Sequence, residues 1–250
     1  MTGDFYDELS PLYHLIYDNW NESIARQARE LDAVIHELWG DRVSDVLDAA
    51  CGVGTQAIGL AGLGSKVTGS DLSRNSVQRA RREAETRGLG IAFSVADMRH
   101  LFTHHGRAFD LVIACDNAVP HLLSDAQILE AFQQMYQCTR PRGGCIISVR
   151  DYASMELGDT KVVPFGVRHE GPTRYLVFQV WEFHGLIYDL HLYFVEDRAG
   201  SECRTRVMRT KYYAVSIEHL NKLMLEAGYT NVRRLDGRFF QPLLAGERMT

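Results

Sequence analysis

Short apolar runs alternate with helical patterns through the first 150 residues of the chain. Runs of about 4–8 apolar residues bounded by turn signals are typical of buried strands, and five such runs are present, at 43–48, 66–70, 91–95, 109–115 and 145–149. Helical spacing of apolar side chains occurs at 55–62 and again after Ser73 and Ser124, two serines that are suited to cap helices. Strands that alternate with helices predict right-handed βαβ units and a parallel sheet.

Residues before and within this core add two local predictions. Residues 22–38 place apolar side chains on one helical face, and Asn21 is suited to cap that helix. Pro141, Gly143 and Gly144 predict a turn directly before the fifth strand.

After Arg150 the pattern changes to that of longer strands in antiparallel order. Three such strands are predicted, at 175–183, 186–196 and 203–214. Within 186–196 one face is uniformly apolar and the other is mixed, as in an antiparallel sheet with one buried face. We expect this insertion to form a lid or an oligomer surface. A helix capped by Ser216 and two strands, at 231–236 and 240–246, complete the chain.

The composition narrows the class of protein. The chain has 250 residues, a formal net charge of −5 and a pI near 6.1, which suits one α/β domain and argues against nucleic-acid or membrane partners. The N-terminal residues lack the basic and apolar regions of a signal peptide, and no apolar run is long enough to cross a bilayer. Five scattered cysteines without a CxxC pair indicate reduced thiols, so we expect a cytoplasmic protein without disulfides or a metal site.

A glycine-containing loop joins the first strand to the next helix, in the stretch VLDAACGVGTQAIGL at 46–60. Open α/β sheets bind ligands at such junctions, outside the carboxyl ends of their strands. Gly52 and Gly54 allow the backbone to approach a ligand and to present its N–H groups. No Gly-Lys-Ser/Thr follows, which excludes a P-loop, whereas a dinucleotide fold stays open although Ala57 replaces its third glycine. A tight turn without a ligand is the alternative.

Three acids mark the ends of the first three predicted strands. Asp48 precedes the glycine loop, where a carboxylate can orient the loop or a cationic ligand. Asp71 ends the second strand, where a carboxylate can accept hydrogen bonds from both hydroxyls of a ribose. Asp97 follows the third strand and is placed to accept the exocyclic amine of adenine, with Met98 packed on the ring. Taken singly, each acid also suits a helix cap or a surface position, but together they outline an adenosine-shaped site.

Residues 43–150 resemble the class I S-adenosylmethionine-dependent methyltransferases in five motifs, VLDAACGVGT, VTGSDLS, VADMRHL, FDLVIACDNAVPHL and RPRGGCIISV. The resemblance implies an α/β, Rossmann-like sheet of seven strands with the last strand antiparallel, S-adenosylmethionine as cofactor and S-adenosylhomocysteine as product. In that family the glycine loop lies along the methionine part of the cofactor, the second-strand acid holds ribose and the later acid meets adenine. These roles fall on Ala50, Gly52, Gly54, Asp71, Asp97 and Met98. The expected cofactor-binding set also includes Asp48, Leu72 and Cys115.

The flanks resemble the glycine/sarcosine N-methyltransferases in FYDELSPLYHLIYDNWNESIARQ at the start, RTKYYAVSIEHLNKLMLEAGY near the end and IISVRDY after the fifth strand. This resemblance implies a helical cover over the cofactor, with an arginine on the cofactor carboxylate. Tyr17, Trp20 and Arg26 are the candidates for that cover, although aromatic residues at this spacing also suit a core. His121 matches a family histidine near the cofactor, and a lone histidine also suits a structural role.

Arg150 and Asn117 are expected to hold the substrate. Arg150 follows the fifth strand, and a guanidinium binds a carboxylate through two parallel hydrogen bonds. The family's carboxylate-binding arginine matches this position, and a salt bridge to Asp151 is the alternative. The amide oxygen of Asn117 can accept a hydrogen bond from a substrate amine, which would direct the nitrogen lone pair at the methyl group. The family places a substrate-contacting asparagine here, and an Asx turn before Pro120 is the alternative.

Two tyrosines of the insertion are further candidates. Tyr193 and Tyr213 can add phenol oxygens around the site of methyl transfer, although both also suit sheet packing. Tyr212 and Tyr213 point to opposite faces of a strand, so only one of them can face the site.

These observations predict one methyltransferase domain over residues 1–250. Its parts are an N-terminal helical cover (1–40), a cofactor-binding core (43–150), a substrate-side antiparallel insertion (151–214) and a C-terminal helix with the final strand pair (215–250). The predicted activity is direct in-line methyl transfer to a small amino acid, glycine or sarcosine, without a metal and without an assigned general base. The rivals are N- or O-methylation of another small molecule, a non-catalytic protein that binds the cofactor, and a nicotinamide enzyme. The exposed faces of the insertion also suit a homodimer.

Overall fold

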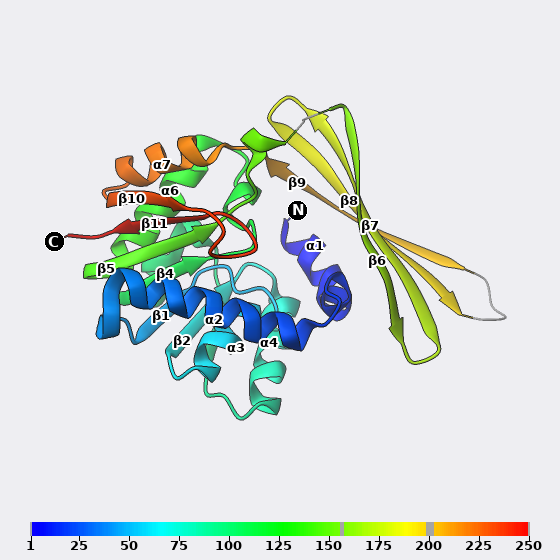
Figure 1. Ribbon diagram of the computed structural model, residues 1–250, viewed down its shortest axis with the longest axis horizontal. Coiled ribbons are helices and arrows are strands. Elements are labelled where there is room, and N and C mark those ends of the chain that lie inside the picture. The colour runs from blue at the N-terminus through cyan, green and yellow to red at the C-terminus, as the bar shows by residue number, and fades with distance from the viewer. Residues whose placement is uncertain (1, 156–157, 199–202, 250) are drawn as a thin grey trace.

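A seven-stranded sheet forms the centre of the computed structural model, which describes residues 2–155, 158–198 and 203–249 (Figure 1). The strand order is β10-β11-β5-β4-β1-β2-β3. The strands are β1 (Asp45–Asp48), β2 (Lys66–Asp71), β3 (Ala92–Val95), β4 (Phe109–Ala114), β5 (Thr139–Ser148), β10 (Thr230–Leu235) and β11 (Leu243–Glu247). β11 pairs antiparallel with both β10 and β5, and the β1, β2, β3, β4 and β5 pairs are parallel. The predicted methyltransferase sheet is therefore confirmed.

Helices cover both faces of this sheet. Successive strand residues point to opposite faces, so Val46 belongs to one apolar cluster and Leu47 to the other. The first cluster packs against α2 (Trp20–Trp39), α3 (Thr55–Gly62) and α4 (Arg74–Thr86). The second packs against α5 (Leu101–His105), α6 (Asp125–Gln137) and α7 (Ile217–Glu226). Short 3₁₀ turns lie at η2 (Gly40–Arg42), η3 (Met98–His100), η4 (Val119–His121) and η5 (Tyr152–Ser154). Burial on both faces explains why the parallel strands read as continuous apolar runs.

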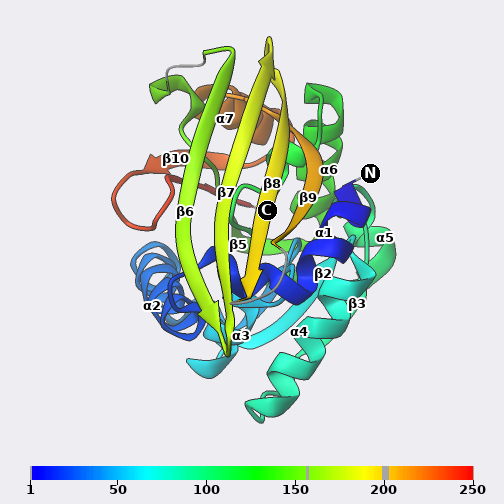
Figure 2. The same cartoon turned by 90° about the vertical axis from the view of Figure 1, so that its right-hand side faces the viewer.

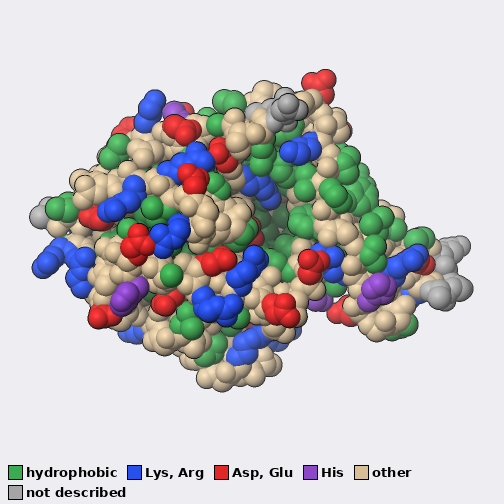
Figure 3. All heavy atoms as spheres, viewed as in Figure 1, with side chains coloured by type: hydrophobic (Ala, Val, Ile, Leu, Met, Phe, Trp, Pro, Cys, Tyr) green, Lys and Arg blue, Asp and Glu red, His purple; other side chains and the backbone are tan. Residues whose placement is uncertain are grey.

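A second, four-stranded antiparallel sheet forms an outer layer, which faces the viewer in Figure 2. Its strands are β6 (Thr160–Glu170), β7 (Thr173–His184), β8 (Ile187–Arg198) and β9 (Arg204–Tyr213). The inner face is apolar and packs on α1 (Thr2–Leu9) and η1 (Ser10–Ile16), which lie between this sheet and the seven-stranded body (Figure 1). Figure 3 shows a hollow between the two layers, with hydrophobic side chains on its walls. The N-terminal segment and the second sheet thus close one side of the core.

The insertion has one strand more than the sequence predicted. β6 contains Pro164 and Gly166, and its pairing with β7 shifts between these two residues. Proline and glycine weaken a strand pattern, and both are tolerated at bulges of edge strands. β6 is an edge strand of its sheet, which explains how it forms despite them. Residues 156–157 and 199–202 of the predicted insertion lie outside the described residues.

The turn predicted at Pro141, Gly143 and Gly144 is wrong, because all three residues lie within β5. A Cβ atom at Gly143 would lie 2.4 Å from the carbonyl oxygen of Asp110, and one at Gly144 would lie 2.0 Å from the ring of Trp39. These glycines therefore serve close packing against β4 and α2. Glycine in a strand marks such close approaches as well as turns.

The N-cap predicted for the first long helix is also wrong by two positions. α2 begins at Trp20, and the side chain of Asn19, not that of Asn21, accepts a hydrogen bond from the backbone N–H of Glu22. The helix has 20 residues. Neither α2 nor any other helix in the described part of the chain combines the length and apolar composition needed to cross a membrane.

Candidate functional site

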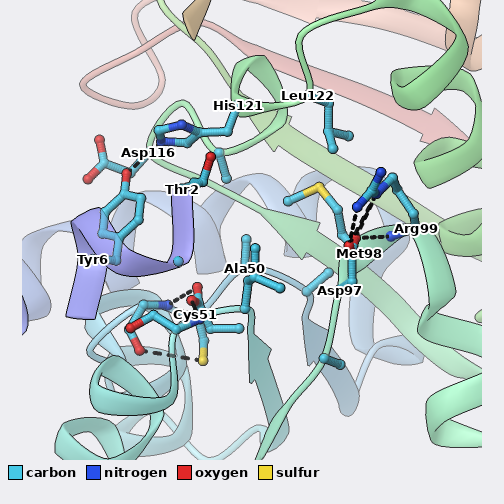
Figure 4. Close-up of a pocket in the computed structure, with 18 of the residues that line it drawn as sticks. Thr2, Tyr6, Ala50, Cys51, Asp97, Met98, Arg99, Asp116, His121 and Leu122 are labelled. Carbon is cyan, nitrogen blue, oxygen red and sulfur yellow. Dashed lines mark hydrogen bonds and ion pairs between the residues drawn. The ribbon is translucent and has the colours of Figure 1, made fainter. Parts of the chain in front are cut away.

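A cavity of about 220 Å³ lies at the carboxyl ends of the central parallel strands, beneath α1. Its walls come from 49–52 after β1, 71–73 after β2, 96–99 after β3 and 115–116 after β4, with Thr2, Gly3, Tyr6 and Tyr13 of the N-terminal segment above them. The carboxyl ends of parallel strands meet at one edge of a sheet, which is why segments distant in sequence share this cavity. In Figure 4, Tyr6, Asp116 and His121 lie together at one end of the cavity, and Asp97, Met98 and Arg99 lie at the other.

The two loop glycines have different structural roles. Gly52 lines the cavity with a φ of 51°, and a Cβ atom there would meet nothing within 4 Å, so the backbone faces open space. Gly54 lies outside the lining and is the N-cap residue of α3, with a φ of 97°. A Cβ atom at Gly54 would come within 2.9 Å of Ile58. Of the two glycines, Gly52 therefore lines the cavity and lets a ligand approach the backbone closely.

Asp71 is fixed by the glycine loop and by the start of α4. Its Oδ2 atom accepts the backbone N–H of Gly52 at 2.9 Å, and its Oδ1 atom accepts that of Ser73 at 2.8 Å. Burial raises the pKa of Asp71, while the two N–H donors act in the opposite direction. Each oxygen keeps one acceptor position, which suits the two hydroxyls of a ribose. Leu72, Cys115 and Ala50 line the same cavity.

Asp97 and Met98 line the opposite end of the cavity with Arg99. Arg99 donates to both Asp97 oxygens, through Nε to Oδ1 at 3.1 Å and through Nη2 to Oδ2 at 2.5 Å. Burial opposes ionisation of this carboxyl, but the Arg99 hydrogen bonds outweigh it and lower the pKa of Asp97. The carboxylate is thus an oriented acceptor beside a thioether, which suits the amino group and the face of an adenine.

Asp48 supports the glycine loop from below and does not line the cavity. Only 1% of its surface is exposed. Its Oδ1 atom accepts the N–H of Ala50 at 3.4 Å, and its Oδ2 atom has no hydrogen-bond partner among the described residues. Burial raises the pKa of Asp48 to about 7.

Arg150 does not line the cavity and lies in an aromatic enclosure. Its Nη1 atom donates to the Tyr188 hydroxyl at 3.2 Å, and its Cζ atom lies 5.0 Å from the ring centroid of Trp181 and 5.3 Å from that of Tyr212. The salt bridge considered between Arg150 and Asp151 is wrong, because Asp151 binds Arg234 at 2.6 Å. Arg150 forms no ion pair with any residue in the described ranges. A guanidinium remains charged at all physiological pH values, so this partly buried cation has no ion-pair partner among the described residues, although Asp116 interacts with it electrostatically from beyond ion-pair distance.

Asn117 is fully buried and binds within the protein rather than facing the cavity. Its Oδ1 atom accepts the backbone N–H of Arg150 at 3.0 Å, and its Nδ2 atom donates to the Tyr152 hydroxyl at 2.8 Å. Tyr152 in turn shares a hydrogen bond with Tyr188 at 3.0 Å. The structure therefore places Asn117 as a support for Arg150 and its enclosure, and not at the substrate amine as the sequence suggested.

Of the two tyrosines at the end of β9, Tyr212 contacts the cavity residues Tyr6 and His121 without lining the cavity itself, whereas the sequence analysis named Tyr213. Tyr212 stacks on His121 with ring centroids 4.0 Å apart, and Tyr213 points away and donates to Asp125 at 2.9 Å. Tyr193 lies on the outer face of its sheet, where its ring stacks on Phe178 at 4.7 Å. Neither Tyr193 nor Tyr213 lines the cavity.

A chain of hydrogen bonds joins Tyr212, Tyr6 and His121. The Lys211 carbonyl can only accept, so His121 Nδ1 carries the proton that is donated across 3.3 Å. Nε2 therefore accepts the Tyr6 hydroxyl at 2.8 Å, and the Tyr212 hydroxyl lies 3.3 Å from that of Tyr6. Burial lowers the pKa of His121 to about 3, so the ring is neutral. Tyr6 was not predicted, and no local pattern distinguishes it from a core aromatic residue.

The remaining cover candidates lie outside the cavity. Trp20 is buried and its indole N–H donates to the hydroxyl of Thr55 at 2.9 Å, at the start of α3. Tyr17 donates to Asp116 at 3.3 Å from behind the lining. Arg26 is exposed on α2, so the structure does not place it where it could reach a ligand in this cavity.

Comparison with known proteins agrees with this geometry. Residues 46–143 match the family model of a methyltransferase domain. The chain is 30% identical over 144 residues to the putative methyltransferase YqeM of Bacillus subtilis, a match that covers 58% of this chain and 52% of that protein. It is 32% identical over 148 residues to a glycine/sarcosine N-methyltransferase of Parasynechococcus marenigrum, again over 58% and 52% of the two chains. The chain thus spans about half the length of these curated relatives.

The fold extends the similarity to almost the whole chain. CalS10, an amino pentose methyltransferase from Micromonospora echinaspora whose structure was solved with S-adenosylmethionine bound, superposes with a TM-score of 0.79. The match covers 90% of this chain and 92% of CalS10 at 18% sequence identity. The protein therefore has the fold of S-adenosylmethionine-dependent methyltransferases, and its match to the methyltransferase-domain model falls on residues that form much of the cavity floor.

Proposed function

We propose that the protein is an S-adenosylmethionine-dependent N-methyltransferase whose acceptor is a small amino acid, glycine or sarcosine or a close relative. The single observation that carries the acceptor class is Arg150, a partly buried cation that has no anionic partner among the described residues. Leaving such a charge unpaired is unfavourable, and a ligand carboxylate satisfies it through two parallel hydrogen bonds.

The floor of the cavity fits the cofactor. Gly52 offers open backbone, Asp71 offers two oriented oxygens for ribose, and Asp97 with Met98 offers an acceptor and a soft apolar contact for adenine. When bound, S-adenosylmethionine supplies an electrophilic methyl group on a positively charged sulfur. Its adenosine end would then lie near Asp97, and its reactive end toward Tyr6 and Asp116 (Figure 4).

The protein's own contribution to the rate is orientation and exclusion of water. Correct alignment of two reactants can supply about 7–11 kcal/mol of the barrier. Arg150 would fix the carboxylate of the acceptor, and the aromatic rings of Tyr212 and Trp181 would restrict its position. α1 covers the cavity and would keep solvent from the reacting groups. The neutral ring of His121 orients Tyr6 and is a poor proton acceptor, because its pKa is near 3.

A second candidate is an acceptor without a carboxylate, such as an amino sugar or another small molecule methylated on N or O. The inner face of the second sheet favours it, because Trp181, Tyr188 and Tyr212 form an aromatic wall that suits a ring-shaped ligand. CalS10, which shares this architecture, is named for such an acceptor. In that case Arg150 would stack on the ring wall without binding an anion.

The test is methyl transfer from labelled S-adenosylmethionine to glycine, sarcosine, dimethylglycine, other amino acids and glycine methyl ester. We expect transfer to glycine or sarcosine and little to the ester. Arg150→Ala should raise the acceptor KM about 10–100-fold, the loss of one charge-assisted pair, with cofactor affinity unchanged. Arg150→Lys should recover only part of this loss, because lysine cannot bind a carboxylate bidentately. Arg174→Ala, an exposed residue paired with Asp197 on the second sheet, is the matched control.

Each alternative predicts a distinct result. Transfer to the ester or to ring amines that Arg150→Ala does not weaken would favour the second candidate. Tight cofactor binding without transfer to any acceptor would favour a binding protein without turnover, and a thermal shift with NAD would favour a nicotinamide enzyme.

A further inference from the structure

Asp116, at the end of β4, has an unusual backbone for its residue type. Its φ is 59° and that of the next residue, Asn117, is 63°. Left-handed backbone costs a non-glycine residue about 1–2 kcal/mol, and such strain concentrates at functional sites. Ser148 holds both residues in place, because its hydroxyl accepts the N–H of Asp116 at 2.7 Å and its carbonyl accepts the N–H of Asn117 at 3.0 Å.

The strained backbone presents the Asp116 carboxylate to a set of neutral donors. Tyr13 and Tyr17 donate to its Oδ2 atom at 3.0 and 3.3 Å, and the Gln241 amide lies 3.4 Å from its Oδ1 atom. These contacts come from η1, from the residue that follows it and from the loop before β11. They orient the carboxylate without neutralising it, and Asp116 forms no ion pair with any residue that the structure describes. Oδ1 keeps room for a stronger donor, since a carboxylate oxygen accepts two hydrogen bonds.

The position of this carboxylate is at the acceptor end of the cavity. Asp116 lines the cavity beside Tyr6 and His121 and opposite Asp97 (Figure 4). It follows β4, and Arg150 follows β5, the neighbouring parallel strand. The two strand ends therefore offer an anion and a cation that interact electrostatically but form no ion pair with each other or with another described residue. A ligand with both charges would satisfy both sites.

We propose that Asp116 binds the amine of the acceptor and makes the enzyme specific for amines over hydroxyl acceptors. This inference rests on the proposed function, because it requires S-adenosylmethionine as the cofactor. The role of Asp116 at the amine does not depend on whether Arg150 binds a carboxylate. The carboxylate accepts an N–H from the amine in both its charged and its neutral form. The ammonium has no lone pair, so one proton passes to solvent before transfer. In the neutral amine the remaining N–H contact to the carboxylate fixes the direction of the lone pair, which forms the new N–C bond as the S–C bond of the cofactor breaks and S-adenosylhomocysteine leaves.

The test uses variants that preserve the fold. Asparagine adopts left-handed backbone at least as readily as aspartate, so Asp116→Asn removes the charge and leaves the local structure. We expect it to raise the KM of amine acceptors at least tenfold, with the Kd for S-adenosylmethionine changed less than twofold. Asp116→Gly should raise the KM in the same way, but it also leaves the Tyr13 and Tyr17 hydroxyls without their acceptor, which offsets the relief of backbone strain, so no rise in Tm is expected. Asp110→Asn, at the other end of β4 and paired with Arg140, is the control and should leave the acceptor KM unchanged.

Three ligands separate this inference from the carboxylate site. Glycine carries both groups, glycine methyl ester lacks the carboxylate, and glycolate lacks the amine and serves as a competitive inhibitor. Asp116→Asn should weaken glycine and the ester and leave the Ki of glycolate unchanged, whereas Arg150→Ala should weaken glycine and glycolate and spare the ester. If Asp116→Asn leaves the KM of every amine unchanged, or if the wild type methylates only hydroxyl acceptors, the inference is overturned while the cofactor assignment stands. Weakened glycine and ester in Asp116→Asn, together with an unchanged KM of glycine and an unchanged Ki of glycolate in Arg150→Ala, would uphold Asp116 and reject the carboxylate clamp.

Discussion

Replacing Asn117 with alanine distinguishes a residue that supports the site from one that touches the substrate. In the structure its side chain is fully buried and both ends of the amide are used, by the N–H of Arg150 and by the Tyr152 hydroxyl. Its φ of 63° is tolerated by asparagine and by glycine but is unfavourable for alanine. Asn117→Ala and Asn117→Gly therefore remove the same hydrogen bonds but differ in backbone strain.

The size of the effect follows from these contacts. Asn117→Ala leaves the Arg150 N–H unpaired, at about 1–3 kcal/mol, and removes one neutral hydrogen bond, at about 1 kcal/mol. Left-handed backbone adds about 1–2 kcal/mol for alanine, so the total is about 3–6 kcal/mol. For a chain of this size that corresponds to a fall in Tm of roughly 10 °C. Tyr152 keeps its second partner, Tyr188, and adds no further penalty.

The assay combines denaturant unfolding with acceptor kinetics. Asn117→Ala should lose the most stability, and Asn117→Gly should lose about 1–2 kcal/mol less. Both should raise the acceptor KM, because Arg150 loses the contact that positions its backbone. Wild-type stability in Asn117→Ala together with a raised KM would refute this reasoning, because it would mean that the amide faces the substrate.

Three other predictions follow from single residues. Burial raises the pKa of Asp48 to about 7, so the folded protein keeps a proton that the unfolded chain releases near pH 4, and the stability linked to this proton is lost as the pH rises through about 7. Between about pH 5 and about pH 8, the free energy of unfolding in urea should therefore fall more for the wild type than for Asp48→Asn. Equal falls in the two proteins would count against the raised pKa. Tyr212→Phe should lower kcat/KM about fivefold through one lost hydrogen bond, whereas Tyr193→Phe, on the outer face, should behave as wild type; the reverse order would contradict the orientation of the sheet. Gly144→Ala should lower the free energy of unfolding by about 1–3 kcal/mol, because the new methyl group would meet Trp39 at 2.0 Å, and an unchanged Tm would show that the ring can move aside.

The residues on the floor of the candidate site could be predicted from the sequence, whereas those at its acceptor end could be predicted only in part. Asp71 ends β2, and Asp97 and Gly52 follow β3 and β1, and the carboxyl ends of parallel strands converge on one edge. Strand identity alone therefore placed these residues together. The position of Arg150 could be predicted for the same reason, because it lies just after the carboxyl end of β5. The expected position of Asn117 was close to the site, but its hydrogen-bond partners are not visible in the sequence.

The site residues that the sequence analysis did not predict contact partners that are far away in the sequence. Tyr6 meets His121 across 115 positions of sequence, and Tyr13 meets Asp116 across 103. Their signal in the sequence is that of an aromatic residue on an amphipathic segment, which a core position explains equally well. A carboxylate after β4 likewise resembles a surface acid until the phenols that surround it are located.

The sequence by itself determined the α/β order, the ligand-binding edge of the sheet and the acids along it, because these depend on periodicity and on residues next to strand ends. Tertiary structure alone decided which tyrosine of β9 faces the site, since that depends on the pairing of Tyr188 with Tyr212 across two strands and on the docking of the second sheet over α1. It also decided that Asp116 and Arg150 form no ion pair with any residue that the structure describes. Whether a charge is paired depends on what the whole fold brings within reach of it, and no local pattern of residues carries that information.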